Sequence, residues 1–338
     1  MKAVMRYFAL LLTLAIAASG SGRALAEDSA AAAEEAKKVY EVTWTDEDLS
    51  TPMKWAGSTY FNNPQFKETR FENYNNGAPI PPGGTRETSF YMVYREDGVY
   101  LFLQSNEPET GADGKPLQSS LELFVAAGEG DIPYSQLIVP TSGTDIEYHE
   151  WQTEHRDHRP LKGSVRVESA AIPGAWGTLV VIPWEAVYDS IPLDGGYWQF
   201  NLIRWSPSDA QTWGGQVHQP GKFNLLRFRQ PTPKQRMAIQ KYLLGKAWSK
   251  FQSVSAELTE HWLQDPATRD IRFYTRHVLP LIAKGSVPGT QMHKLDRMDE
   301  TETGSMYRNV PDWMELRYNV DDKRLIYVKK MLMAESID

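Results

Sequence analysis

The chain has 338 residues, no cysteine and a formal net charge of −7. The lack of cysteine excludes disulfides, thiol nucleophiles and cysteine-type zinc sites, so an exported protein of this sequence must rely on a sizeable apolar core. An acidic chain is a poor candidate for nucleic acid or for an anionic membrane surface, and we expect neither as a partner.

The first 26 residues have the layout of a secretory signal peptide. Lys2 and Arg6 give a basic start, residues 8–18 form an apolar run, and residues 24–26 read Ala-Leu-Ala, a typical cleavage site. The apolar run is too short to span a bilayer comfortably. We therefore predict cleavage before Glu27, a secreted or periplasmic location and no membrane insertion of the mature chain. Cleavage removes three cations, which takes the net charge from −7 to −10.

Residues 27–38 are rich in alanine and glutamate, lack an apolar stripe and are expected to form a flexible lead. Alternating apolar and polar residues, with turn signals between them, then predict an antiparallel β-sandwich of the jelly-roll kind over residues 39–230. Beyond residue 231 the apolar spacing becomes helical, which predicts a mostly helical extension packed on the sandwich. Within this extension we expect Gly285 to end a helix and residues 286–309 to form a polar loop.

The most informative stretch for function is 195–228, which reads as two strands joined by a loop. In the first strand Trp198, Phe200 and Leu202 alternate toward a core, while Gln199, Asn201 and Trp205 face the other way. Trp213 stands on the loop beside a glycine pair, where its flat face could stack on a sugar ring. Arg204, Asn201 and Gln199 would then line the same end. The alternative is that Trp213 folds back as a lid over the core.

A family resemblance appears at this point. The order Phe200-Asn201, Trp213, Pro220, Phe223 and Leu225 resembles the closing segment of family 9 carbohydrate-binding modules, and Ile182-Pro183-Trp184 resembles their I-P-W motif. The likeness covers roughly residues 41–229. It implies a non-catalytic β-sandwich that binds an oligosaccharide or polysaccharide of plant or algal origin in support of polysaccharide breakdown. It also implies that Glu122 contacts the ligand, and it leaves a structural calcium ion open.

The resemblance lacks two elements of the family's sugar site: an Arg on the next strand, which would fall near positions 136–137 where this chain has Gln and Leu, and the second aromatic residue of the sugar clamp. The missing aromatic residue would fall near positions 116–117, where this chain has Pro and Leu. Trp151 is the natural replacement. It lies in a polar stretch that also holds His149, Glu150, His155 and His158, which could form a metal or ligand site or a solvated loop; no H-E-x-x-H spacing is present.

Two other classes of protein stay open. In an enzyme, carboxylates such as Glu122, Glu150 and Glu154 could pair as the acid and nucleophile of a glycosidase, or the module could accompany one. In a haem-binding electron-transfer domain similar to the DOMON-like cytochromes, Met92 and a loop histidine would hold the haem.

Overall fold

The computed structural model describes residues 37–83, 87–105, 120–127, 133–140, 147–151, 156–157, 165–206, 210–214, 217–264 and 271–335. The predicted leader, the clamp position at 116–117, Glu154, His155 and His158 lie outside these ranges. Residues from Lys37 onward form one compact unit.

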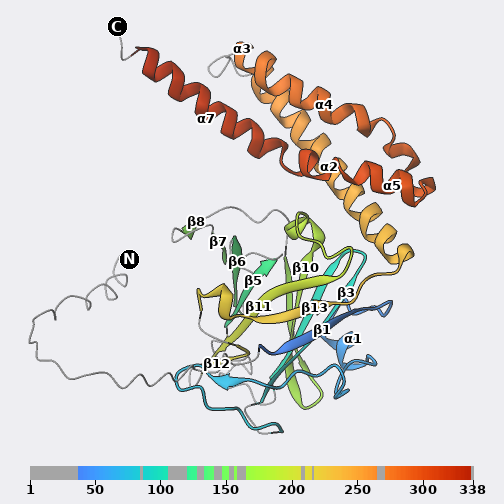
Figure 1. The fold of residues 1–338 in the computed structure, drawn as a ribbon, viewed down its shortest axis with the longest axis vertical. Coiled ribbons are helices and arrows are strands. Elements are labelled where there is room, and N and C mark those ends of the chain that lie inside the picture. Colours follow the sequence, from blue (N-terminus) through green and yellow to red (C-terminus); the bar gives the residue numbers. More distant parts are fainter. Residues whose placement is uncertain are drawn as a thin grey trace, which may run out of the picture. The chain divides into compact units, whose positions relative to one another are not determined.

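The first part of this unit is built almost entirely of strands (Figure 1). Only a short helix, α1 (Pro52–Ala56), and two single turns, η1 (Trp184–Val187) and η2 (Pro220–Lys222), interrupt them within the described residues. The strands are β1 (Val39–Trp44), β2 (Glu72–Asn73), β3 (Thr88–Arg95), β4 (Gly98–Ser105), β5 (Ser120–Ala127), β6 (Tyr134–Pro140), β7 (Glu147–Trp151), β8 (Arg156–Asp157), β9 (Arg166–Ile172), β10 (Ala175–Pro183), β11 (Gly196–Trp205), β12 (Ala210–Thr212) and β13 (Asn224–Phe228).

The strands follow one hydrogen-bonded path in the order β8-β7-β6-β5-β11-β13-β1-β3-β4-β10-β9, with β12 and β2 beside β11. Strand β1 joins the two halves of this path. Its first residues, Val39 to Val42, pair with β13, and Thr43 and Trp44 pair with β3. A strand that changes sheets in this way turns a continuous path into two packed layers. Both pairings of β1 are parallel, so the sheet is mixed; the other strand pairings within the described residues are antiparallel, as the predicted antiparallel sandwich requires.

The main core lies between the two layers. It takes Phe90 and Leu101 from one layer, and Leu123, Phe200 and Leu202 from the other. The alternation in β11 is therefore as predicted, because Trp198, Phe200 and Leu202 are all buried in this core. Nearly every aromatic ring here meets another tilted or edge-to-face, the arrangement that ring quadrupoles favour.

The helices follow the last strand (Figure 1). They are α2 (Pro233–Gln264), α3 (Ile271–Phe273), a π-helical turn η3 (Tyr274–Val278), α4 (Leu279–Gly289), a 3-10 turn η4 (Met292–Arg297), α5 (Glu300–Tyr307), α6 (Val310–Met314) and α7 (Leu316–Glu335). Side-chain contacts join α2 to the strand segment: Arg236 pairs with Asp194 over 2.6 Å, and the Tyr242 hydroxyl donates to Glu185 over 3.4 Å. In the described part of the chain, none of these helices combines the length and apolarity that crossing a bilayer needs.

The loop predicted for residues 286–309 is wrong. Helix α4 continues through Gly285 to Gly289, and α5 begins after Asp299 with a full capping box. The Asp299 carboxylate accepts the Glu302 N–H over 2.8 Å, and the Glu302 carboxylate accepts the Asp299 N–H over 3.2 Å. The acidic run that we interpreted as loop is therefore a helix start, where carboxylates stabilise the positive end of the helix dipole.

Candidate functional site

The predicted role of Trp213 in stacking is wrong, because its indole has no exposed face. Trp213 is 0% exposed and packs edge-to-face on Phe90, with centroids 5.2 Å apart, and tilted against Phe200 at 5.9 Å. The alternative reading, a loop residue folded into the core, describes the structure.

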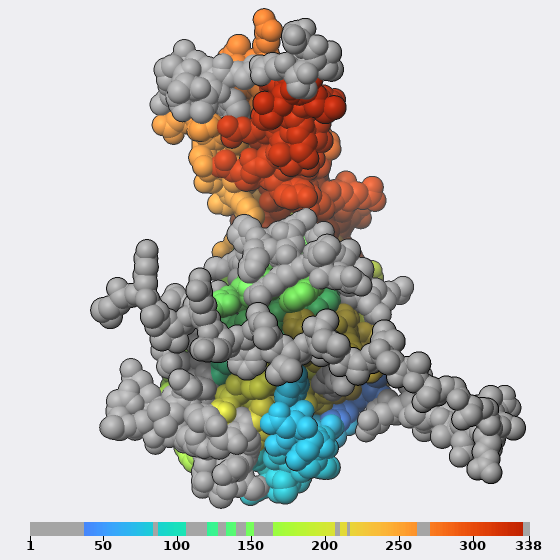
Figure 2. Space-filling model, turned by 90° about the vertical axis from the view of Figure 1, so that its left-hand side faces the viewer, coloured from blue at the N-terminus to red at the C-terminus, as the bar shows by residue number. Residues whose placement is uncertain are grey.

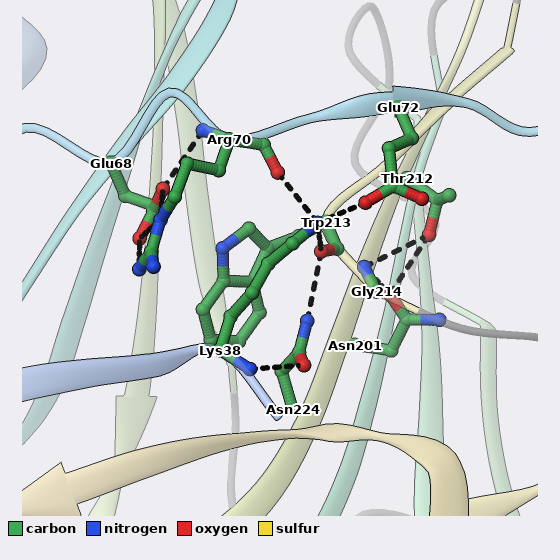
Figure 3. Close-up of polar contacts among 9 residues, drawn as sticks. All are labelled: Lys38, Glu68, Arg70, Glu72, Asn201, Thr212, Trp213, Gly214 and Asn224. Atoms are coloured by element: carbon green, nitrogen blue, oxygen red, sulfur yellow. Dashed lines mark hydrogen bonds and ion pairs between the residues drawn. The ribbon is translucent and has the colours of Figure 1, made fainter. Parts of the chain in front are cut away.

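Polar groups from distant parts of the chain hold Trp213 in the core (Figure 3). Its carbonyl oxygen accepts hydrogen bonds from Asn224 Nδ2 over 2.9 Å and from Lys38 Nζ over 3.0 Å. The next residue, Gly214, donates its N–H to Asn201 Oδ1 over 3.1 Å. Gly214 cannot carry a side chain here, because an added Cβ would lie 2.6 Å from Asn224 Cγ. The glycine that suggested an open loop instead permits close packing.

Three more predicted site residues belong to the scaffold, so the structure does not place them on an accessible binding surface. Asn201 is 0% exposed, and its Oδ1 also accepts the Thr212 hydroxyl over 3.0 Å. Gln199 is buried as well. Arg204 points to the inner side of β11, where its guanidinium donates to the hydroxyls of Thr88, over 3.0 Å, and Ser105. Arg204 lies an odd number of residues from Asn201, and the period of two along a strand puts them on opposite faces.

The candidate site lies on the other face of the sheet made by β5, β6, β7 and β11, which we call the outer face. Green atoms of the β5–β7 segment reach the surface in the view of Figure 2. Four side chains lie along a diagonal line across these strands. On each successive strand, the side chain of the line stands two residues away from the residue that pairs directly with the previous member of the line. They are Trp205 on β11, Glu122 on β5, Gln136 on β6 and Trp151 on β7. Diagonal neighbours of this kind are within reach of long side chains.

Hydrogen bonds follow the diagonal. Trp151 Nε1 donates to Gln136 Oε1 over 3.1 Å, and Gln136 Nε2 donates to Glu122 Oε2 over 3.4 Å. Trp205 lies close enough to Glu122 to stabilise its carboxylate, although its Nε1 makes no hydrogen bond of standard geometry among the described residues. Of the predicted site residues, the structure thus brings Glu122, Trp151 and Trp205 into one line. All three are half-buried, so part of each side chain reaches solvent.

Burial raises the pKa of the Glu122 carboxyl above its ordinary value, against the opposing effect of Gln136 and Trp205, which favour the charged form. Desolvation is the larger of these influences. A partly buried carboxylate whose hydrogen bonding is only partly satisfied is a strong acceptor for a ligand hydroxyl.

Aromatic residues gather at each end of the diagonal. At one end Trp151 stacks parallel to Tyr134, with centroids 5.9 Å apart, and the His218 ring lies 4.4 Å from the Trp151 centroid. His218 Nδ1 is also hydrogen-bonded to the Tyr134 hydroxyl over 2.9 Å. At the other end Tyr74 meets Trp205 edge-on at 5.1 Å.

The backbone of His218 has a φ of 58°, in the left-handed region that non-glycine residues seldom adopt. Strained conformations of this kind often occur where a side chain must be aimed at a site. Sequence reasoning missed His218, Tyr134 and Gln136. The alternation along β6 could have put Tyr134, Gln136 and Ile138 on one face, but not the register that sets Gln136 beside Glu122.

His149, the last predicted site residue, lies beside Gln136 on the same outer face but is 3% exposed. Its Nε2 lies 3.5 Å from a carboxylate oxygen of Glu147. In the described ranges, no group of three or more His, Cys, Asp or Glu side chains could hold a metal ion.

The strand registers also bear on the two alternative functions, a glycosidase and a haem-binding domain. Glu150 pairs with Ser135, and Glu122 faces Ile138, so the two carboxylates project from opposite faces of the sheet. They cannot flank one scissile bond as a glycosidase pair must. Met92 is buried in the core between the layers, whereas His149 and His218 belong to the outer face, so neither is placed to share a haem with it.

No protein-family model matches the chain, and no curated protein does. Among solved structures the chain is similar to a family 9 carbohydrate-binding module from Caldicellulosiruptor kristjanssonii in complex with cellotriose, at 13% identity and a TM-score of 0.38, over 58% of this chain and 95% of that one. A structure of a module of the same family and organism in complex with glucose is similar at 12% identity and a TM-score of 0.35, over 58% and 97% of the two chains. This is the family that the sequence motifs resemble.

Proposed function

We propose that the protein binds an oligosaccharide or polysaccharide on the outer face, along the diagonal from Trp205 to Trp151. The observation that carries the proposal is the hydrogen-bonded line of Trp151, Gln136 and Glu122 with an indole at each end. A sugar ring has apolar C–H faces, which stack on aromatic rings, and hydroxyl edges, which need carboxylate and amide partners. Sites of this composition are typical for small polar ligands.

The length of the diagonal favours a chain of sugars over a single ring. From β11 to β7 the line crosses three strand spacings of about 4.8 Å, or roughly 14 Å across the sheet, and it also advances along the strands. A ligand that meets both indoles must therefore be extended. Together with the export signal expected in residues 1–26, this supports a secreted or periplasmic protein that binds plant or algal polysaccharide without cleaving it.

Affinity electrophoresis and calorimetry against a panel of plant and algal polysaccharides test the proposal. We expect at least one polysaccharide to bind, and we expect Trp151→Ala and Glu122→Gln to weaken that binding. Trp44→Ala is the matched control. Trp44 is also a half-buried indole, but it lies on β1 against Tyr94, and β13, β11, β5 and β6 separate that strand from β7. Binding that the control and the site variants lose equally would contradict the proposal, as would no binding to any member of the panel.

A further inference from the structure

Helix α7 has apolar side chains on two opposite faces. One face packs on the other helices through Leu316 and Val320, which are almost fully buried, and through Tyr327, whose ring lies 5.3 Å from that of Phe273. The opposite face is exposed to solvent (Figure 1 shows α7 in red). An ordinary surface helix is polar on the side away from its core. The exposed apolar side chains on this face of α7 are therefore unusual for a protein that exists only as a monomer.

From Asp321 to Met333 α7 is exposed on nearly every side, and seven residues form one continuous stripe, which we call the α7 stripe; the exposed apolar residues Val328 and Met331 lie outside it. The seven residues fall within an arc of about 120° at 100° per residue. The stripe consists of Tyr318, Asp322, Leu325, Ile326, Lys329, Leu332 and Met333, of which the five apolar members are between 47% and 66% exposed.

The stripe is nearly palindromic about the midpoint between Leu325 and Ile326. Counting outward from that point, Leu325 matches Ile326, Asp322 matches Lys329, and Tyr318 matches Met333. Suppose that the α7 helix of a second copy lies antiparallel to the first, with a twofold axis through this midpoint. Each residue of a matched pair on one helix then faces the other residue of that pair on the second helix. The interface then contains an apolar centre, two identical Asp–Lys ion pairs and a methionine–aromatic contact at each end.

Within the described residues of α7, the charges of Asp322 and Lys329 are not paired. In the described part of the chain, neither Asp322 nor Lys329 takes part in an ion pair. No residue of opposite charge stands three or four positions from either of them, which are the spacings at which helical side chains meet. A parallel pairing in register would set Asp322 against Asp322 of the other copy, so the charges select the antiparallel arrangement.

From these observations we infer that the α7 stripe is the docking surface for a second copy of this chain, in an antiparallel, twofold-symmetric dimer. The stripe is about 24 Å long, since its 16 residues rise about 1.5 Å each. One helix face of this length lies at the small end of specific interfaces, so the dimer should form reversibly in the micromolar range.

Sedimentation equilibrium of the mature full chain between about 1 µM and 500 µM tests this inference, over the range expected for a small interface. We expect a monomer–dimer equilibrium in the wild type. Asp322→Lys and Lys329→Asp should each weaken association at least about 10-fold, because each places like charges across the axis. The double variant D322K/K329D should restore association, because it rebuilds the two ion pairs with their signs exchanged.

Lys323→Asp is the matched control, because it makes the same charge change as Lys329→Asp on α7 but outside the stripe. Thermal melts of every variant confirm folding, which these exposed positions should leave unchanged. A wild type that stays monomeric over the whole range would overturn the inference. So would single variants that associate like the wild type, or a double variant no better than either single variant.

Discussion

The indole Nε1 of Trp151 on β7 donates to Oε1 of Gln136 on β6 over 3.1 Å, and this bond orients the amide so that its Nε2 points to Glu122. The indole therefore does two things. It places a half-buried aromatic ring at the end of the diagonal, and it fixes the donor and acceptor ends of the amide beside the carboxylate. A ligand that stacks on Trp151 meets a polar line that is already oriented.

The first prediction separates these two roles. Trp151→Ala removes both the ring and the donor, and we expect binding to the best polysaccharide to weaken about 10- to 100-fold, or about 1.4–2.8 kcal/mol. Trp151→Phe keeps a ring but frees the Gln136 amide, so its loss should be intermediate. Calorimetry gives both values, and circular dichroism confirms that the variants fold. Equal affinity in Trp151→Ala and wild type would refute stacking at this position.

The second prediction concerns Trp213, whose ring is enclosed by the core and whose carbonyl is held by Lys38 and Asn224. Trp213→Ala should lower the free energy of unfolding by about 3–5 kcal/mol, as expected for an emptied aromatic site. The measurement is urea denaturation followed by circular dichroism. Under conditions where the variant is still fully folded, its affinity for the polysaccharide should be close to that of the wild type. A large loss of affinity with an unchanged midpoint would mean that the indole contacts ligand after all.

Trp213 shows where the sequence stopped being informative. Local alternation places Trp198, Phe200 and Leu202 in the core, because the period of a strand depends only on neighbouring residues. The position of Trp213 depends on Lys38, which is 175 residues away in the chain. No local pattern reports a contact of that kind. The Arg204 error was avoidable, because the same period of two assigns Arg204 to the inner face.

The candidate site was predictable in part for the same reason. Glu122 and Trp151 were selected from the sequence, one by resemblance and one as a replacement for a missing aromatic. Their connection through Gln136 depends on the registers of β5, β6 and β7, which are set by long-range pairing. His218 reaches the site from a segment beyond β12. Its left-handed backbone conformation is unusual for histidine, so the sequence did not predict it.

The third prediction follows from the raised pKa of Glu122. The folded protein holds this proton more tightly than the unfolded chain, whose glutamate titrates near pH 4.3. As the pH rises through that value toward the folded pKa, the unfolded state loses its proton first, and the stability of the folded protein falls. Glu122→Gln removes this penalty and can still accept from Gln136. The variant should therefore melt at a higher temperature than the wild type at pH 7, with the difference vanishing below about pH 4.

Thermal melts from pH 3.5 to pH 7.5 give the measurement for this third prediction, over a range that spans the ordinary titration of glutamate. The control is Glu96→Gln in the exposed turn between β3 and β4, which should show no gain in stability at neutral pH. A Glu122→Gln variant that is less stable than wild type at pH 7 would show that the carboxylate stabilises the fold, contrary to the burial argument.

The fourth prediction compares two glycines that both lie inside helices. Gly285 in α4 faces Phe251 of α2, and an added Cβ would lie 2.6 Å from the Cζ atom of that ring. Phe251 is 2% exposed and stacks on Trp248 at 5.3 Å, so it has little room to move. The carbonyl of Gly285 also accepts the Trp313 indole N–H over 2.9 Å. Gly285 therefore marks a close helix contact, and not the helix end that its sequence position suggested.

Gly285→Ala should destabilise the protein by about 1–3 kcal/mol, because overpacking outweighs the gain in helix propensity. Gly304 in α5 has no atom within 4 Å of an added Cβ, so Gly304→Ala should instead stabilise by up to about 1 kcal/mol. Chemical denaturation of the two variants beside the wild type measures both changes. The opposite signs are the test, since helix propensity alone predicts that both substitutions stabilise. A gain in stability at Gly285 would mean that α2 and α4 do not approach as closely as Phe251 and Gly285 indicate.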